Sequence, residues 1–364
     1  MKIAIIPGDG IGKEVIAEGI KLLESLDIEY DIFNYDADYW IKYGKGIGDD
    51  EIENFRKNYS AIYFGALGDE RLPKMEHGKA ILLKLRFELE LYANIRPIKM
   101  LKPELSPLKK ADKIDFVIIR ENTEDLYRGI GGSFKTGHFD EVVIDQRIHT
   151  RKGVTRIIKY AFEYAIQNNR KSVMLVDKHN AIPNGGQLWL EIFETVSKKY
   201  PQIKTSYEHV DIAAAKMVMN PEKFDVVVTS NLFGDILSDL GAGIIGGVGL
   251  SASSNINVEG IGLFEPVHGS APDITGMEKA NPIAAFETLA MLFGHLNLYS
   301  HEKYLKQAIE QSIKDEITTP DLGGTYTTSQ VGNYIVKLVH EYITNNKTHD
   351  HLLNCKTHEE ALEA

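Results

Sequence analysis

The chain carries two aspartates, Asp235 and Asp239, placed four residues apart at the start of a predicted helix. Residues with this spacing lie one above the other on a helix, so both carboxylates can point toward one position. Because adjacent carboxylates repel each other unless a cation neutralises them, the pair predicts a site for a hard divalent ion, Mg²⁺ or Mn²⁺. The spacing alone also fits an ordinary pair, in which one carboxylate is stabilised at the helix amino terminus and the other is solvated.

Three arginines, Arg86, Arg96 and Arg120, are candidates for anion recognition. A guanidinium binds a carboxylate through two parallel hydrogen bonds, so several together can hold a dicarboxylate. Each arginine taken alone is equally explained by a structural salt bridge. Arg120, which is followed directly by Glu121, is the clearest case of that alternative.

Three further residues have side chains suited to catalysis or metal binding. Lys178 follows a predicted buried strand, where a lysine can act as a general base if burial or nearby cations depress its pKa. Tyr127 is a candidate proton donor, and Asp211, which opens a predicted helix, is a candidate third metal ligand. The alternatives are a surface lysine, a tyrosine that only packs, and a helix-capping aspartate.

The elements that must position these residues are short apolar runs alternating with longer amphipathic stretches, which is typical of an α/β fold with much parallel sheet. A stretch with three prolines, Pro97–Lys110, predicts a loop or crossover, and the glycines of Gly241–Gly249 predict close backbone packing or a hinge. The predicted strands are Ile3–Ile6, Ile28–Phe33, Ala61–Phe64, Phe116–Ile119, Ser172–Val176 and Val226–Thr229, and the predicted helices are Lys13–Ser25, Lys79–Tyr92, Val154–Gln167, Gly186–Lys198 and Asp211–Met219.

Length and composition limit the class of protein. A chain of 364 residues predicts two closely joined domains. Its net charge of -11 argues against nucleic acid or an anionic membrane as the main partner. The single cysteine, Cys355, excludes an intrachain disulfide and fits a reducing compartment, and there is no run of ~20 apolar residues. We therefore expect a cytoplasmic protein that does not enter the membrane.

A glycine-rich turn, Pro7-Gly-Asp-Gly-Ile-Gly12, follows the first predicted strand and superficially matches a dinucleotide-binding fingerprint. That fingerprint requires its third glycine at the position of Lys13. The sequence thus argues against an ordinary Rossmann domain, although the turn can still line a ligand cleft at the end of a strand.

Five motifs follow one another in an order typical of one family. They are Tyr92-Ala-Asn-Ile-Arg-Pro, Arg120-Glu-Asn-Thr-Glu-Asp-Leu-Tyr, Val176-Asp-Lys-His-Asn, Asn231-Leu-Phe-Gly-Asp-Ile-Leu-Ser-Asp and Phe264-Glu-Pro-Val-His-Gly-Ser-Ala-Pro-Asp. With this set the chain resembles the isocitrate/isopropylmalate dehydrogenases, a family of decarboxylating β-hydroxyacid dehydrogenases. The resemblance implies an isopropylmalate-dehydrogenase-like two-domain α/β fold that is not a Rossmann fold. Residues 1–95 and 248–345 would form a cofactor-side domain, residues 96–247 a domain with the metal, the catalytic residues and the dimer interface, and residues 346–364 a C-terminal tail.

The resemblance also assigns roles. It implies a homodimer with shared active sites, in which Lys178 is the general base, Tyr127 the general acid, and Lys178 and Asp211 reach the site of the other subunit. Asp273 favours NAD⁺ over NADP⁺, because its carboxylate suits ribose hydroxyls and repels a 2′-phosphate. By the same resemblance Arg86, Arg96 and Arg120 would grip the malate moiety, Asp211, Asp235 and Asp239 would bind Mg²⁺ or Mn²⁺, and His268, Gly269, Ser270, Ala271, Asp273 and Asn281 would hold NAD.

The substrate is predicted from the residues before Arg86. Isocitrate enzymes of the family carry Ser and Asn at the positions of Ala80 and Leu82, and Leu83 adds further apolar surface. An isopropyl group buried there gains roughly 2 kcal/mol, whereas a carboxylate would be destabilised. We therefore expect oxidative decarboxylation of 3-isopropylmalate to 4-methyl-2-oxopentanoate, a step of leucine biosynthesis.

Alternatives to that substrate remain open at this stage. Lys79, where many isopropylmalate enzymes carry an acid, and the small Ala181 leave tartrate, D-malate, homoisocitrate or isocitrate as possible substrates. A non-catalytic regulatory subunit is the alternative from a different functional class.

Overall fold

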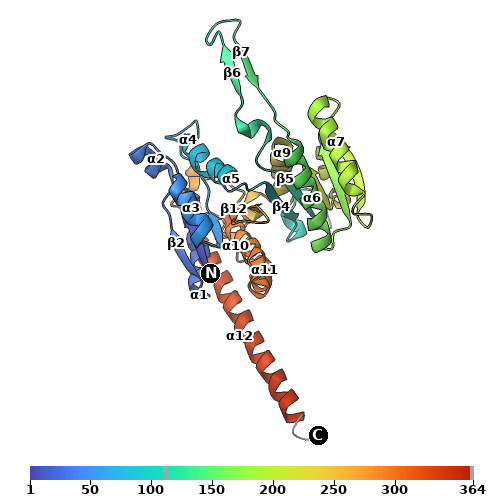
Figure 1. Cartoon of the computed structure of the whole chain (residues 1–364). Coiled ribbons are helices and arrows are strands. Elements are labelled where there is room, and N and C mark those ends of the chain that lie inside the picture. Colours follow the sequence, from blue (N-terminus) through green and yellow to red (C-terminus); the bar gives the residue numbers. More distant parts are fainter. Residues whose placement is uncertain (110–112, 361–364) are drawn as a thin grey trace.

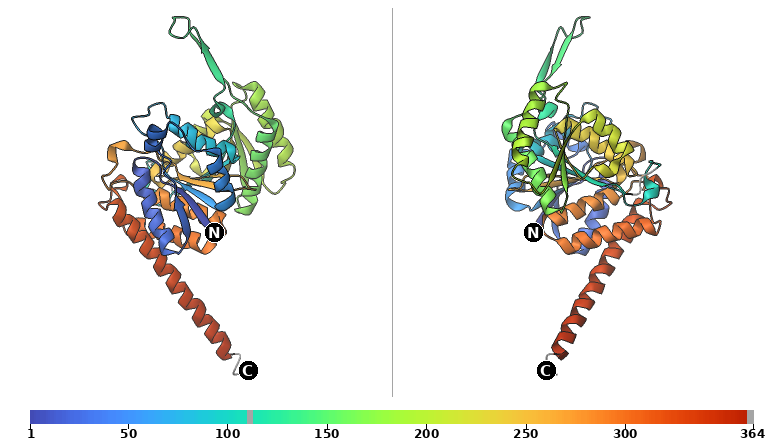
Figure 2. Two further views of the ribbon diagram at one scale, coloured as in Figure 1. Left: turned by 60° about the vertical axis from the view of Figure 1, so that its left-hand side comes forward. Right: turned by 90° about the vertical axis from the view of Figure 1, so that its right-hand side faces the viewer.

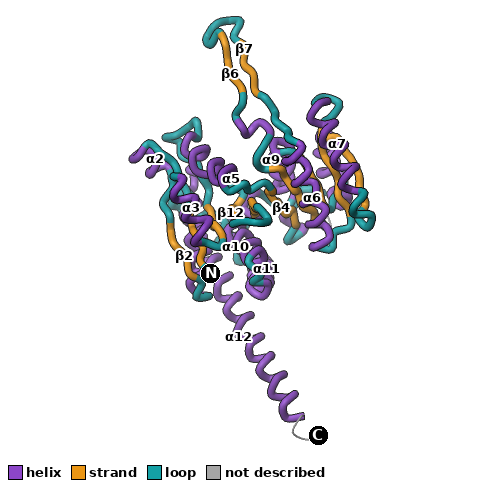
Figure 3. Tube along the Cα trace, viewed as in Figure 1, coloured by secondary structure: helices purple, strands orange, loops and turns teal. Residues whose placement is uncertain are grey.

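The computed structural model describes residues 1–109 and 113–360, with side chains as far as residue 345. The central feature of this part is a ten-stranded sheet with helices on both faces (Figure 1 and Figure 3). Its strand order is β2-β1-β3-β12-β11-β4-β5-β10-β8-β9. The strands of the sheet are β1 (Lys2–Ile6), β2 (Glu29–Ile32), β3 (Ala61–Phe64), β4 (Ala93–Lys99), β5 (Asp115–Glu121), β8 (Ser172–Asp177), β9 (Lys204–His209), β10 (Val226–Thr229), β11 (Ala252–Ile256) and β12 (Gly262–Pro266).

The helices have the amphipathic patterns that the sequence predicts. All six predicted strands are present, and four of the five predicted helices correspond to α1, α6, α7 and α8. The helices are α1 (Ile11–Ser25), α2 (Ala37–Tyr43), α3 (Asp49–Asn58), α4 (Glu76–Gly78), α5 (Lys84–Glu88), α6 (Arg151–Gln167), α7 (Pro183–Ser197), α8 (Val210–Met219), α9 (Asn231–Ile244), α10 (Ile283–His295), α11 (Tyr299–Lys314) and α12 (Thr328–Glu360).

The fifth predicted helix, Lys79–Tyr92, is interrupted. It consists of a π-helical segment, η1 (Lys79–Leu83), followed by α5, and it ends at Glu88. In η1 the backbone N–H of Lys84 donates to the carbonyl of Lys79, five residues earlier. A π turn inserts one extra residue and rotates the residues around it by about 100° relative to a regular α-helix. This rotation changes which side chains share a face.

The predicted loop Pro97–Lys110 is wrong at its beginning, because Pro97 lies within β4. Strand β4 pairs antiparallel with β5 along its whole length, but it pairs with β11 only from Ala93 to Ile95. Pro97 therefore lies past the two-sided part of the strand, where a missing N–H can be tolerated.

The two faces of the sheet differ. One face carries a continuous hydrophobic cluster against α1, α6, α7, α10, α11 and α12. The other face carries two separate clusters, one with Phe55 and Leu85 from α3 and α5, and one with Met217 and Leu237 from α8 and α9. The place where these two clusters separate lies over the antiparallel strands β12, β11, β4 and β5.

The predicted close packing of the glycine-rich segment occurs at Gly241, which lies inside α9. A Cβ at this position would lie 2.7 Å from Cδ1 of Ile98 on β4. A larger residue would therefore push α9 away from the sheet.

Two segments project from opposite ends of the molecule, the hairpin β6 (Gly131–Phe134) and β7 (Val142–Asp145) and the end of α12 (Figure 1 and Figure 2). Residues 361–364 of the predicted tail lie outside the described residues, and the side chain of Cys355 belongs to the undescribed part. The predicted domain boundaries at residues 95 and 345 fall inside β4 and α12, and the division into two domains stays a prediction. Within residues 1–109 and 113–360, no helix combines the length and the apolar character needed to cross a bilayer.

Candidate active site

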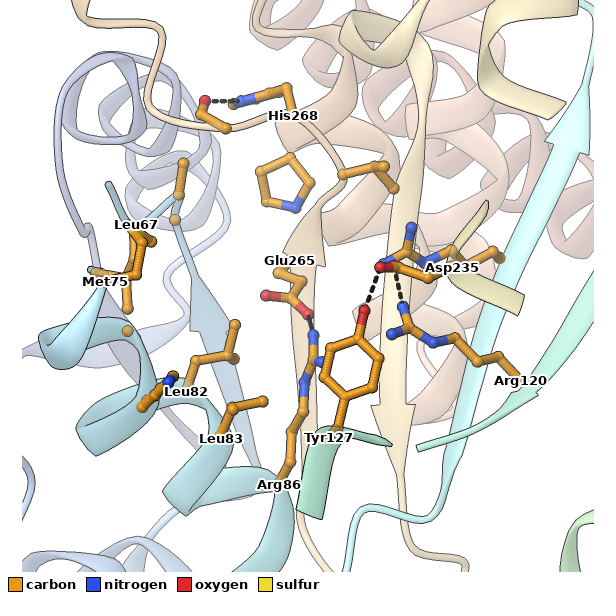
Figure 4. Close-up of a pocket in the computed structure, with 18 residues that line it drawn as sticks. Leu67, Met75, Leu82, Leu83, Arg86, Arg120, Tyr127, Asp235, Glu265 and His268 are labelled. Atoms are coloured by element: carbon orange, nitrogen blue, oxygen red, sulfur yellow. Dashed lines mark hydrogen bonds and ion pairs between the residues drawn. The ribbon is translucent and has the colours of Figure 1, made fainter. Parts of the chain in front are cut away.

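A cavity of about 330 Å³ lies where the two hydrophobic clusters separate. Figure 4 shows the side chains that line it. Its walls come from η1 and α5, from strands β4, β5 and β12, from the 3₁₀ turn η3 (Asp125–Arg128), and from α9. The lining brings together many of the predicted site residues, namely Leu82, Leu83, Arg86, Arg96, Arg120, Tyr127, Asp235, His268 and Gly269.

Strand alternation explains why this surface is polar. In β5, Phe116 and Ile118 point toward α9 and Arg120 continues that face, while Val117 and Ile119 point into the continuous core. The same alternation holds in β4 and β12, where Asn94, Arg96 and Glu265 face the cavity side. Each strand therefore changes from apolar to polar on one face as it reaches the site.

Arg120 is the most deeply buried of the three arginines, with 1% of its surface exposed. Its Nε donates to Oδ1 of Asn231 at 2.9 Å, and its Nη1 donates to Asp235. Gly234 permits this arrangement, because a Cβ there would lie 2.5 Å from Cγ of Arg120. Burial, together with the like charges of Arg96 and Arg86, lowers the pKa of Arg120 to about 10, so it is protonated at neutral pH. The suggested alternative, a salt bridge between Arg120 and Glu121, is not formed, because these two side chains have other partners.

Arg96 connects β4 to α9. Its Nη1 donates to Oγ of Ser238 at 2.9 Å and to Oδ1 of Asp239 at 3.2 Å, and its Nη2 lies 3.7 Å from Asp235. Its Nε donates to Oδ1 of Asn94 at 3.0 Å. The two aspartates of the opening motif are thus neutralised by arginines from the sheet.

Arg86 enters from the opposite wall, on α5. Its Nη2 donates to Oε1 of Glu265 at 2.7 Å, whereas its Nε is buried and has no hydrogen-bond partner among the described residues. An unpaired buried donor on a cation is costly unless a ligand satisfies it. The Nε–H of Arg86 is therefore available to donate a hydrogen bond to a bound anion.

Tyr127 stands between the arginines and α9. Its hydroxyl donates to Oδ2 of Asp235 at 2.5 Å, and the Arg120 guanidinium lies 5.2 Å from the centre of its ring. Burial and the hydrogen bond to Asp235 raise the pKa of Tyr127 although Arg120 opposes them, so the phenol keeps its proton at neutral pH. Asp125, in the left-handed conformation with φ 68°, turns the backbone into η3 and is held there by Arg147.

The pair Asp235 and Asp239 has the donor chemistry for a hard divalent ion. Burial opposes ionisation of Asp235, but the charges of Arg120 and Arg96 and the bond from Tyr127 outweigh it and lower its pKa. Burial raises the pKa of Asp239, whose side chain is still 62% exposed. In the described part of the chain, no group of three metal-binding side chains lies close together. The two carboxylates fit Mg²⁺ or Mn²⁺ only with oxygen ligands supplied from elsewhere, such as substrate, water or a second chain.

Lys178 and Asp211 lie apart from the cavity and form their own ion pair. Nζ of Lys178 donates to Oδ1 of Asp211 at 2.5 Å, which lowers the pKa of that exposed carboxyl. Among the described residues that line the cavity, neither is present. One chain thus brings together the arginines, Tyr127 and Asp235, but leaves these two residues outside.

The predicted cofactor loop forms the upper wall in Figure 4, where His268 is labelled. Nδ1 of His268 lies 2.9 Å from the carbonyl of Gly269, and its buried Nε2 has no hydrogen-bond partner in the part of the chain that the structure describes. A carbonyl only accepts, so Nδ1 donates and Nε2 is a free acceptor; burial lowers the pKa of His268 and keeps the ring neutral. This free acceptor fits a ligand with hydroxyl or amide donors.

The remaining predicted cofactor residues surround that loop. The carbonyl of Ser270 accepts from the N–H of Ile11 at 2.9 Å, and a Cβ at Gly10 would collide with it, so the glycine-rich turn supports the loop. Ala271 has φ 40°, and Asp273 is exposed. Asn281 is used internally, since it donates to Asp321 at 2.9 Å and accepts from the N–H of Ile283 at 3.0 Å.

The apolar side of the cavity departs from the sequence-based expectation at one position. Leu82 and Leu83 line the cavity together with Lys79, but Ala80 does not. A Cβ at Gly46 would lie 2.6 Å from the Ala80 Cβ, so this side chain faces the loop that contains Gly46. Lys79, Leu82, Leu83 and Arg86 have the three- and four-residue spacing of one helix face, whereas Ala80, two residues before Leu82, lies on another face.

Sequence reasoning also omitted residues that organise the site. Glu265, Asn231 and Ser238 each bond to one of the arginines. All three residues lie within the quoted motifs, so a search for hydrogen-bonding side chains among the motif residues would have found them.

Comparisons with known proteins agree on one family. A sequence profile described as isocitrate/isopropylmalate dehydrogenase matches residues 2–335. A 3-isopropylmalate dehydrogenase of Bifidobacterium longum (strain DJO10A) is 43% identical over 343 residues, covering 92% of this chain and 98% of the relative. A 3-isopropylmalate dehydrogenase of Streptomyces griseus is 43% identical over 338 residues, covering 91% of this chain and 96% of the relative. The structure of isocitrate dehydrogenase from Methylococcus capsulatus matches with a TM-score of 0.85 and 37% identity, covering 93% of this chain and 99% of that one. These comparisons confirm the predicted α/β fold of the isopropylmalate-dehydrogenase type.

Proposed function

Because this chain belongs to the isocitrate/isopropylmalate dehydrogenase family and is a decarboxylating dehydrogenase, we propose that it oxidises and decarboxylates 3-isopropylmalate with NAD⁺ and a divalent metal. The product would be 4-methyl-2-oxopentanoate, a precursor of leucine. The observation that carries this proposal is the cavity itself. It combines three buried arginines for two carboxylates with an apolar surface from Leu82 and Leu83, which lie on the same helical segment as Arg86.

The arginines would bind the malate moiety. Arg86 and Arg120 lie on opposite walls, and each guanidinium can form a forked pair with a carboxylate. Asp235 and Asp239 would hold Mg²⁺ or Mn²⁺ together with oxygens of the substrate. When bound, the metal supplies Lewis-acid polarisation of the substrate hydroxyl and carboxylate, and NAD⁺ supplies the hydride acceptor.

The proton transfers would belong to two side chains. Lys178 of a second subunit would take the proton from the C2 hydroxyl as hydride leaves C2. Loss of the carboxylate on C3 as CO₂ leaves an enol, and Tyr127 would donate its proton to C3. The raised pKa of Tyr127 supports this role, because the phenol is protonated at neutral pH.

The cofactor is assigned from the loop that follows β12. The free Nε2 of His268 and the exposed Asp273 support a nucleotide with ribose hydroxyls, and the carboxylate of Asp273 would repel a 2′-phosphate. NAD⁺ is therefore proposed over NADP⁺. The sole cysteine agrees with a reducing compartment such as the cytoplasm.

The deciding experiment compares kcat/KM for 3-isopropylmalate, isocitrate, homoisocitrate, D-malate and tartrate with NAD⁺ and Mn²⁺. The proposal expects 3-isopropylmalate to have the highest value. Lys79, which lines the cavity, favours one competing result, because its ammonium would attract an anionic substituent. A preference for isocitrate or homoisocitrate would therefore overturn the assigned substrate.

A substitution at Leu82 tests the apolar wall. Leu82→Ser is expected to lower kcat/KM for 3-isopropylmalate about tenfold, because roughly 1.5 kcal/mol of apolar burial is lost. D-malate, which has no substituent at C3, should be affected much less. The matched control is Ala80→Ser, which changes a residue on the same segment that faces Gly46. Equal loss for both substrates would contradict the assignment of the wall.

We also propose a homodimer with shared sites. Apolar side chains are exposed on the β6–β7 hairpin and on α8 and α9, including Phe134, Phe139, Val143, Met219 and Ile236. Exposed apolar surface of this kind favours burial against a partner. A second chain is also required if Lys178 and Asp211 are to act at a cavity that they do not line.

Mixing two inactive variants tests the shared site. A chain with Lys178→Ala keeps its arginines, and a chain with Arg120→Met keeps its Lys178. If subunits exchange at random, half of the dimers are mixed and each has one intact site, so about a quarter of the original activity should return. If each site uses only its own chain, mixing restores no activity.

A further inference from the structure

A continuous row of buried amide and carboxylate side chains connects Arg86 to Arg96 beneath the cavity. Oε1 of Glu265 accepts from Nη2 of Arg86 at 2.7 Å and from Nδ2 of Asn255 at 2.9 Å. Oδ1 of Asn255 accepts from Nδ2 of Asn94 at 2.9 Å, and Oδ1 of Asn94 accepts from Nε of Arg96 at 3.0 Å. Asn255 is the central member of this row.

The sheet register dictates the row. Asn255 on β11 lies directly opposite Asn94 on β4, and on its other side it faces Leu263 on β12. Directly opposed residues of antiparallel strands point to the same face, and Glu265 is the next residue on that face of β12. Three neighbouring strands therefore present three polar side chains in line between the two arginines.

The direction of every hydrogen bond in the row is fixed by its ends. Guanidinium groups only donate, so Asn94 must turn its Oδ1 toward Arg96 and its Nδ2 toward Asn255. Asn255 must then turn its Nδ2 toward Glu265, where it also donates to the carbonyl of Leu263 at 3.3 Å. Neither asparagine can rotate its amide without placing two donors or two acceptors together.

The arginines need such a support because they are buried beside one another. Arg86 is 6% and Arg96 is 8% exposed, and each positive charge disfavours the other. Within the described residues, Glu265 is the hydrogen-bond partner of Arg86, and Asn94 is the partner of Nε of Arg96. A movement of Asn255 would release both acceptors at once.

We propose that Asn255 is a positioning residue, which holds Glu265 and Asn94 in place and so fixes the spacing of Arg86 and Arg96 for the two carboxylates of the substrate. Asn255 is fully buried and is not among the residues that line the cavity. It acts through its neighbours and does not touch the substrate. This inference rests on the proposed function, in which the arginines bind a dicarboxylate hydroxyacid.

The test uses two variants of Asn255 and one control, with the full chain and Mg²⁺. Asn255→Leu removes the whole set of hydrogen bonds at nearly constant size. Asn255→Asp keeps the shape but places a carboxylate oxygen against Glu265, where like charges repel. The matched control is Thr288→Val. Thr288 is equally buried, and its hydroxyl donates to the carbonyl of Ala284 at 2.7 Å within α10 and bonds to none of Asn255, Glu265 and the two arginines.

The measurement is the Kd of D-malate by calorimetry, with Tm and the KM for NAD⁺ recorded alongside. Asn255→Leu should raise the Kd about tenfold to a hundredfold, because buried bonds that orient charged groups are lost, and Asn255→Asp should raise it further. The KM for NAD⁺ should change little. Thr288→Val should lower Tm and leave the Kd unchanged.

A purely structural role would give the opposite pattern. If Asn255→Leu lowers Tm and leaves the Kd unchanged, or if Thr288→Val raises the Kd equally, the proposal is overturned. Should Asn255→Leu not fold, the isosteric Asn255→Asp decides. Binding is measured without turnover, so a chain that binds D-malate but oxidises none of the hydroxyacids would refute the proposed function and still test Asn255. A chain that binds no dicarboxylate would overturn both.

Discussion

Replacing Arg120 by methionine is expected to lower kcat/KM for the hydroxyacid by about a thousandfold. Methionine keeps much of the length and apolar volume of the side chain but provides no donors. The change would remove the proposed forked contact to the substrate and would leave Asp235 without its closest cation, and breaking a buried ion pair by removing one partner costs about 3–5 kcal/mol. Steady-state kinetics, with Tm measured on the same preparation, checks the prediction.

Arg170→Met is the matched control for this variant. Arg120 lies near the end of β5, and Arg170 donates at 2.6 Å to Asp115 at the start of the same strand. Arg170 lies 3.3 Å from Asp225 as well. Its loss should lower Tm and leave kcat/KM nearly unchanged. If both variants lose activity in proportion to Tm, Arg120 stabilises the fold and does not bind substrate. Arg120→Lys should recover only part of the activity, because an ammonium cannot form the forked contact.

Replacing Tyr127 by phenylalanine is expected to lower kcat about 10²- to 10⁴-fold while the Kd of the hydroxyacid changes little. The phenol would supply a proton after the carboxylate has left, so its absence slows a chemical step and not the binding step. The ring itself, which lies beside the Arg120 guanidinium, is retained. Comparison of kcat with a calorimetric Kd separates the two effects.

Tyr63→Phe provides the control for the removal of a buried hydroxyl. The hydroxyl of Tyr63 donates to the carbonyl of Ala285 at 3.0 Å in the continuous core, far along the chain from the catalytic motifs. Its loss should lower Tm by removing one hydrogen bond and leave kcat unchanged. If Tyr127→Phe retains the original kcat, Tyr127 is not the acid.

Much of the fold follows from local pattern. The parallel strands β1, β3, β8 and β10 are buried on both faces and read as continuous apolar runs, so their positions are predictable. Strand β4 is not, because Pro97 argues against it, and only the one-sided pairing past Ile95 makes the proline acceptable. The π turn in η1 is likewise invisible in the sequence, since its residues fit a regular helix.

For the candidate site, the sequence by itself determined the features that depend only on local geometry, such as which side chains share a helix face or follow a strand. Helical spacing places Asp235 and Asp239 side by side, and the ends of predicted strands place Arg120 and Lys178 at sheet edges. These are short-range relations, so residue types and spacing are sufficient to state them.

The tertiary structure alone decided which groups meet. The register of β12, β11, β4 and β5 joins Arg86 to Arg96 through Asn255, whose neighbours in sequence give no sign of that role. The packing of η1 and α5 against the rest of the molecule also directs Leu82 into the cavity and Ala80 toward Gly46. Register and helix phase depend on contacts between segments far apart in the chain, and a sequence pattern records the face of each element but not its partner.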